Sequence, residues 1–93
     1  MEDHVEDEII HFRAINCKLL DIPQLNMDTI KVLDVSLNRI THAIILPKYL
    51  VYLNLSFNLI NDINDVKFGM FLEYLSLIGN EVTHNKNYRT KLI

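Results

Sequence analysis

The amino-acid sequence predicts an α/β solenoid of four coils, with a short parallel concave sheet and irregular or 3₁₀ segments on the convex side. Three observations predict this fold class. A template of apolar residues around an Asn fits the chain three times, a fourth copy has Cys in the Asn position, and successive copies are 21, 20 and 22 residues apart. Repeats of about 20 to 50 residues are typical of solenoids, in which neighbouring coils bury one continuous core.

Each copy of the template places apolar residues eight, five and three positions before its Asn and one apolar residue two positions after it. The centre of the template predicts a strand whose apolar side chains point into the core while their neighbours point outwards. The Asn amide is expected to turn inwards and to bond backbone groups that the turn leaves unpaired. The copies are Ile9, Phe12, Ala14, Cys17, Leu19; Ile30, Leu33, Val35, Asn38, Ile40; Leu50, Leu53, Leu55, Asn58, Ile60; and Leu72, Leu75, Leu77, Asn80, Val82.

Cys17 takes the Asn position of the first copy, and we interpret this small, weakly donating side chain as structural rather than reactive. Between the copies an apolar residue recurs at about every third position, which favours 3₁₀ or irregular turns over long helices. Pro23 and Pro47 fall in these segments, where a missing N–H interrupts no strand. The sequence therefore predicts an acidic, frayed N-terminus over 1–8, four repeats over 9–82 and a short cap helix over 83–93.

Composition restricts the possible classes of function. The chain has 93 residues, a net charge of −3 and one Cys. So small a domain has little room for an enclosed catalytic cavity, and its charge does not favour direct binding of nucleic acid phosphates. One Cys allows no intrachain disulfide, and the acidic N-terminus lacks the order of a signal peptide, so we expect a cytoplasmic or nuclear protein. The longest apolar run is far below the roughly 18 residues of a membrane span, which predicts no membrane insertion.

The sequence contains no pattern that predicts catalysis. None of the four His has a Cys or a second His at a metal-ligand spacing, and two isolated glycines form no phosphate-binding loop. Ser36 and Ser56 belong to the repeat frame, and no base accompanies them. We therefore expect no enzymatic activity, no metal, no cofactor and no small-molecule substrate.

The residues between the core leucines predict the working surface, because they project from the concave face in columns that cross the coils. The expected partner-binding residues are His11, Arg13, Val32, Asp34, Leu37, Tyr52, Asn54, Phe57, Tyr74 and Ser76. The apolar and aromatic members form a strip, and such strips usually mark a partner site. A face of about 800 Å² suits one helix or loop of another protein. Alternatively, a terminal segment of the chain covers the strip, or the strip is tolerated. Asp34 and Arg13 are expected to form a surface ion pair.

Residues 72–93, LEYLSLIGNEVTHNKNYRTKLI, carry a more specific likeness. The repeats have the leucine-rich repeat pattern L-x-x-L-x-L-x-x-N/C-x-L. The order Y-L-S, N-x-V-T and Y-R resembles the terminal cap of intracellular leucine-rich repeat proteins with short return segments. That group includes the leucine-rich repeat subunit of the spliceosomal U2 particle, whose cap is the most similar, the repeat regulator of type 1 protein phosphatase and the acidic nuclear phosphoproteins. The expected cap residues are Thr83, Tyr88, Arg89, Leu92 and Ile93.

The resemblance implies a noncatalytic adaptor in an intracellular assembly, expected to be a ribonucleoprotein, that holds a protein partner on its concave face. Nucleic acid would be contacted only through that partner or at the basic C-terminus, which contains Lys86, Arg89 and Lys91. Two alternatives remain open. One is a structural or ribosome-bound factor held by its edges and termini, and the other is a phosphatase regulator.

Overall fold

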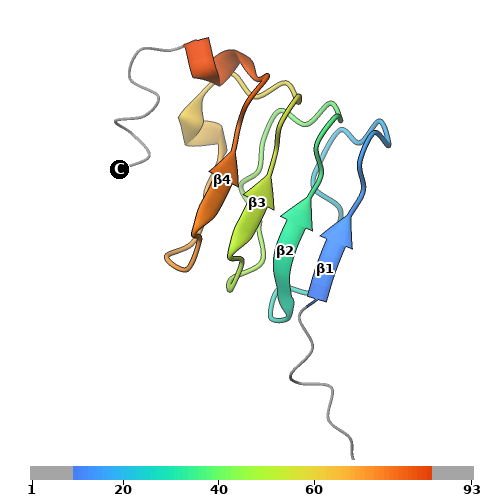
Figure 1. The fold of residues 1–93 in the computed structure, drawn as a ribbon, viewed down its shortest axis with the longest axis vertical. Helices are drawn as coiled ribbons and strands as arrows, with labels where there is room; N and C mark the ends of the chain where they lie inside the picture. The colour runs from blue at the N-terminus through green and yellow to red at the C-terminus, as the bar shows by residue number, and fades with distance from the viewer. Residues whose placement is uncertain (1–9, 85–93) are drawn as a thin grey trace, which may run out of the picture.

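The fold is built on a parallel sheet (Figure 1). The computed structural model describes residues 10–84. Its four strands lie side by side in chain order: β1 (Ile10–Arg13), β2 (Ile30–Asp34), β3 (Tyr52–Asn54) and β4 (Tyr74–Ser76). Every neighbouring pair is parallel, so the chain returns to the same end of the sheet before each new strand. We call a strand together with the segment that follows it a coil. The predicted four-stranded parallel sheet is confirmed, and the arrangement is compatible with an α/β solenoid.

The segments that return the chain from one strand to the next contain little regular structure. Within residues 10–84 the helical segments are two 3₁₀ helices, η1 (Ile63–Asp65) and η2 (Glu81–His84). η1 begins after Asp62, whose carboxylate accepts a hydrogen bond from the Asn64 N–H (2.9 Å), as expected for a residue that caps a helix start. No helix among the described residues is long and apolar enough to cross a membrane.

The template residues form the core, and the inner coils bury them more completely than the outer coils. Leu33, Val35, Ile40, Leu53, Leu55 and Ile60 of the second and third coils are fully buried. Phe12 and Leu19 of the first coil, and Leu72 and Leu75 of the fourth, are only partly buried and pack against this core. An end coil has a neighbouring coil on one side only, so the same side chain buries less surface there.

A buried Asn amide connects each pair of successive coils. Asn58 Oδ1 accepts a hydrogen bond from the Ile40 N–H of the coil before it (2.9 Å). Asn58 Nδ2 donates to the Leu55 carbonyl of its own coil (3.0 Å) and to a carbonyl of the coil before it (3.1 Å). Asn38 and Asn80 make the same kinds of bond. One side chain thus pairs backbone groups of two coils that would otherwise be buried without partners.

The first coil differs from the template in two ways. Cys17 occupies the Asn position, but it is exposed, and its thiol donates a single hydrogen bond to the Ile15 carbonyl (3.4 Å). A single weak S–H donor cannot reproduce the several bonds of an amide. The register also places Ile10 opposite Ile30, where the sequence template had assigned Ile9, which lies outside the described residues.

The described part of the fourth coil ends at η2. Val82 is fully buried there, and the Thr83 hydroxyl donates a hydrogen bond to the Asn80 carbonyl (2.8 Å). Thr83 therefore closes the turn that precedes it. The remaining predicted cap residues, Tyr88, Arg89, Leu92 and Ile93, lie outside the described residues, as does the acidic segment 1–8.

Candidate functional site

The face of the sheet opposite the core, which we call the open face, brings the predicted binding residues together in rows across the strands. The first row is His11, Val32, Tyr52 and Tyr74, and the second is Arg13, Asp34, Asn54 and Ser76. Along β2 and β3 the leucine between the two rows is buried, and its neighbours are less so. The alternation of side chains along a strand therefore places both rows on this face.

A third row lies just after the strands, where the backbone is left-handed. Its residues are Asn16, Leu37, Phe57 and Gly79, with φ of 58°, 59°, 57° and 81°. A left-handed conformation costs a residue other than Gly about 1–2 kcal/mol. Leu37 and Phe57 are held in it by hydrogen bonds from their N–H groups to carbonyls of the next coil (2.9 and 2.8 Å). Their side chains are 49% and 53% exposed.

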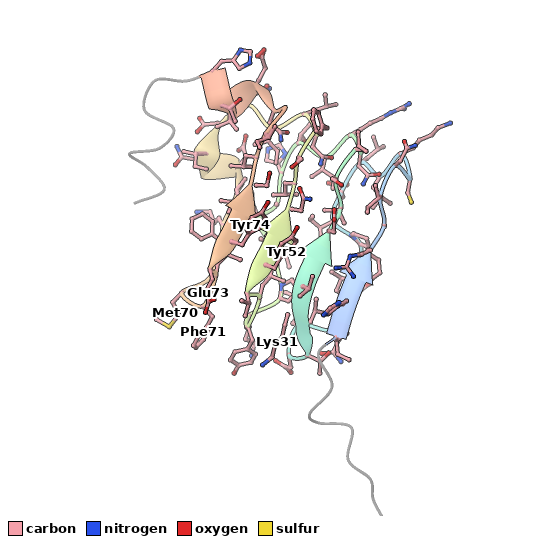
Figure 2. All side chains as sticks on the ribbon, viewed as in Figure 1. Lys31, Tyr52, Met70, Phe71, Glu73 and Tyr74 are labelled. Atoms are coloured by element: carbon pink, nitrogen blue, oxygen red, sulfur yellow. The ribbon has the colours of Figure 1, made fainter. Side chains whose placement is uncertain are left out.

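Two aromatic rings of the first row stack on each other (Figure 2). The rings of Tyr52 and Tyr74 are nearly parallel, with an interplanar angle of 3° and 4.4 Å between centroids. Tyr74 is 47% exposed, and Tyr52 is half-buried. Burial raises the pKa of Tyr52 above its ordinary value, and the nearby Tyr74 and Asp34 raise this pKa further. The pair is therefore a flat aromatic surface that is partly open to solvent.

Phe57 lies over the backbone of the next coil. A Cβ atom at Gly79 would collide with the Phe57 ring at Cδ1, Cε1 and Cγ. Gly79 therefore suits this place in two ways: its positive φ costs a glycine little, and the Phe57 ring occupies the space that a Cβ atom would need. The ring is held against the fourth coil while half of the residue stays exposed.

The second row is less accessible than the sequence predicted. Ser76 is 7% exposed, and its hydroxyl lies 2.6 Å from that of Ser56, so its position lies on the open face but the expectation that it is accessible to a partner is wrong. The predicted ion pair between Arg13 and Asp34 is also absent. Asp34 Oδ1 instead accepts hydrogen bonds from the backbone and hydroxyl of Ser36 (3.1 and 2.8 Å), a local bond that Asp side chains make readily in turns. The guanidinium of Arg13 lies 3.2 Å from the ring of His11.

No family model, curated protein or solved structure matches this chain. Within residues 10–84, no three His, Cys, Asp or Glu side chains form a group that could hold a metal ion.

A second aromatic pair, which the sequence reasoning missed, lies where the strands begin. The rings of Tyr49 and Phe71 are 5.6 Å apart at 45°, and Met70 beside them is among the most exposed apolar residues. Lys31 and Glu73 lie at the same end of the sheet (Figure 2). Tyr49 and Phe71 each stand directly before the first leucine of a template copy, so their equal position in the repeat could have predicted the contact.

The return segments of the first two coils line a groove of about 520 Å³. Its apolar lining includes Ile22, Pro23, Leu25, Ile44 and Ile45. Ile44 and Ile45 are both exposed, because they fall between the apolar positions that point inwards. None of these residues belongs to the predicted binding set.

Proposed function

We propose that this chain is a noncatalytic leucine-rich repeat module that holds a protein partner on its open face. The observation that carries the proposal is the apolar strip on that face, formed by Val32, Leu37, Tyr52, Phe57 and Tyr74. Leu37, Phe57 and Tyr74 are about half exposed. The ring of Tyr74 stacks on that of Tyr52. Exposed apolar side chains gathered on one face usually mark interaction sites, and tyrosines are frequent anchors at the centre of such sites.

The repeat assignment is supported by the buried Asn of three coils and by the shared register of the strands. The further proposal that the partner belongs to an intracellular ribonucleoprotein assembly rests on the resemblance of residues 72–93 to the cap of that group. A protein held by its edges would not need an aromatic strip at the middle of its sheet, which is why we prefer a clamp.

The experiment compares substitutions on opposite sides of the molecule. Tagged wild-type protein is purified from its native cells, the bound proteins are identified, and the affinity of the principal purified partner is measured. We expect Tyr52→Ala and Phe57→Asp each to weaken binding at least about tenfold, since anchor residues at an interface contribute roughly 2 kcal/mol or more.

The matched control is Ile45→Asp, which introduces the same charge at an exposed apolar position of the groove lined by the return segments. It should leave the affinity unchanged, and thermal unfolding must show that all three variants fold. Unchanged binding by both open-face variants would overturn the clamp and favour a factor held by its edges.

A further inference from the structure

We infer that the end of the sheet where the strands begin binds a second copy of this chain in a symmetric dimer. This strand-start surface consists of the rings of Tyr49 and Phe71, the neighbouring Met70 and the charged residues Lys31 and Glu73. Figure 2 shows the side chains of Lys31, Met70, Phe71 and Glu73 at this end. The inference goes beyond the proposed function and does not depend on it, because the strand-start surface shares no residue with the apolar strip of the open face.

The apolar part of the strand-start surface is open to solvent. Met70 is 88% exposed, Phe71 50% and Tyr49 43%, although the rings of Tyr49 and Phe71 already contact each other, with centroids 5.6 Å apart. Exposed apolar side chains that gather on one face usually mark a protein contact, and aromatic residues and Met are enriched in such contacts. The surface therefore offers apolar area for a second protein to bury.

The turns that carry these side chains are packed on one another. The Lys48 N–H, in the turn before β3, donates a hydrogen bond to the Met27 carbonyl, in the turn before β2 (3.0 Å). The Lys48 carbonyl also lies against Gly69, in the turn before β4, where an added Cβ atom would be 3.2 Å from it. A surface built on packed turns keeps its shape before a partner arrives, which lowers the cost of ordering it on association.

The charges of the strand-start surface indicate its partner. The Val51 N–H donates a hydrogen bond to the Lys31 carbonyl, and the Glu73 N–H donates one to the Val51 carbonyl (both 2.9 Å). These three residues therefore form a row across the starts of β2, β3 and β4. Neighbouring strands are about 4.8 Å apart, so the backbones of Lys31 and Glu73, which are both exposed, are about 10 Å apart. Lys48 and Asp28 form an ion pair with each other (3.3 Å). The surface is thus electrically balanced, with a positive and a negative side.

A two-fold axis through the middle of this row makes the surface complementary to itself. The axis reverses the order of the row, so Lys31 of each copy lies opposite Glu73 of the other, and the aromatic pairs of both copies enter the same contact. Symmetric dimers use one patch twice in this way, and opposite charges across a contact select the partner. A partner with one sign of charge would be attracted by one side of the surface and repelled by the other. We therefore assign the surface to a second copy rather than to a strongly basic or acidic protein.

Charge reversal tests this pairing. The oligomeric state of the full chain is measured by sedimentation equilibrium between about 10 µM and about 1 mM, because small interfaces give weak dimers. We expect a reversible monomer–dimer equilibrium. Lys31→Glu and Glu73→Lys should each raise the dimer dissociation constant at least about tenfold, since each opposes like charges at two symmetric places. Lys18→Glu and Glu81→Lys make the same changes of net charge at exposed positions beyond the other end of the strands and should leave the constant unchanged.

Mixing the variants separates the contact from any loss of folding. In an equimolar mixture of Lys31→Glu and Glu73→Lys, both contacts across the axis again join opposite charges, so the dimer should return. The double variant that carries both changes should also dimerise like wild type. A wild-type chain that stays monomeric over the whole range, or single variants that dimerise as wild type does, would overturn the assignment to a second copy. Single variants that neither mixing nor the double change restores would overturn the pairing of Lys31 with Glu73.

Discussion

The two faces of the sheet follow different rules. On the core face successive coils present nearly the same residues, such as Leu33 and Leu53, which are both fully buried and paired across the strands. On the open face the first row changes from His11 in β1 to Tyr74 in β4. A core position must fill a fixed space in every coil, whereas an open position only has to tolerate water. Residues that repeat from coil to coil therefore indicate the fold. Residues that change from coil to coil indicate which surface can bind a particular partner.

The largest expected effect tests the core side of this comparison. Leu53→Ala should lower the free energy of unfolding by about 2–5 kcal/mol, because it opens a cavity between two coils. Leu75→Ala removes the equivalent leucine of the fourth coil, which is only partly buried, and should cost less. Urea denaturation followed by circular dichroism measures both. Leu59→Ala, at an exposed position, is the control and should stay within about 0.5 kcal/mol of wild type; equal costs at Leu53 and Leu75 would contradict the gradient of burial.

The next effect concerns the amide that repeats from coil to coil. Asn58→Ala removes partners from the Ile40 N–H and the Leu55 carbonyl, and a buried backbone group without a partner costs about 1–3 kcal/mol. Cys17→Ala changes the equivalent position of the first coil, where the thiol makes one long bond and is exposed. We expect a loss of less than about 1 kcal/mol in the same denaturation experiment. If Cys17→Ala lowered the free energy of unfolding as much as Asn58→Ala does, Cys17 would stabilise its coil as strongly as the Asn residues stabilise theirs.

A smaller effect tests the contact between the Phe57 ring and the backbone at Gly79. Gly79→Ala should cost about 1–2 kcal/mol for the left-handed conformation alone, and more because the added methyl group displaces the Phe57 ring. The double variant with Phe57→Ala removes that collision. A double-mutant cycle on the unfolding free energies therefore isolates the contribution of the ring. Perfect additivity would show that Phe57 does not pack on Gly79.

Much of the core face could be predicted from the sequence, because apolar residues at fixed distances from an Asn admit one register. The register of Val32, Tyr52 and Tyr74 follows from the same spacing. Ile10 rather than Ile9 lies opposite Ile30, because the register shifts between Ile10 and His11. A fixed spacing contains no such irregularity, so it could not predict this pair.

The polar part of the site was less predictable, because hydrogen bonds within a turn compete with those across the strands. Asp34 was expected to pair with Arg13, its neighbour in the register, yet its carboxylate bonds Ser36 two residues later. Ser76 occupies an open-face position but is buried against the Ser56 hydroxyl. Short polar side chains bond locally before they reach a partner, and a template of apolar positions contains no information about that choice.

The smallest expected effect tests whether the surroundings of Tyr52 shift the pKa of its phenol. The pKa of Tyr52 is raised above 10.0 in the folded protein, first by burial and then by Tyr74 and Asp34. As the pH rises above about 10, the unfolded chain loses this proton before the folded protein does. The stability that the neutral Tyr52 contributes is therefore fully present below that pH and is lost as the pH rises through the folded pKa.

Tyr52→Phe cannot ionise, so its free energy of unfolding should fall less than that of wild type between about pH 8 and pH 11. Tyr49→Phe, a change in the other aromatic pair, is the control for the loss of any one phenol. If the free energy of unfolding falls equally with pH in Tyr52→Phe and wild type, the Tyr52 ring is fully hydrated in the folded protein. The open face would then not differ from other exposed surface. A slope reduced only in Tyr52→Phe would show that this row is already partly desolvated before a partner arrives, which lowers the cost of binding one because fewer water contacts remain to be lost.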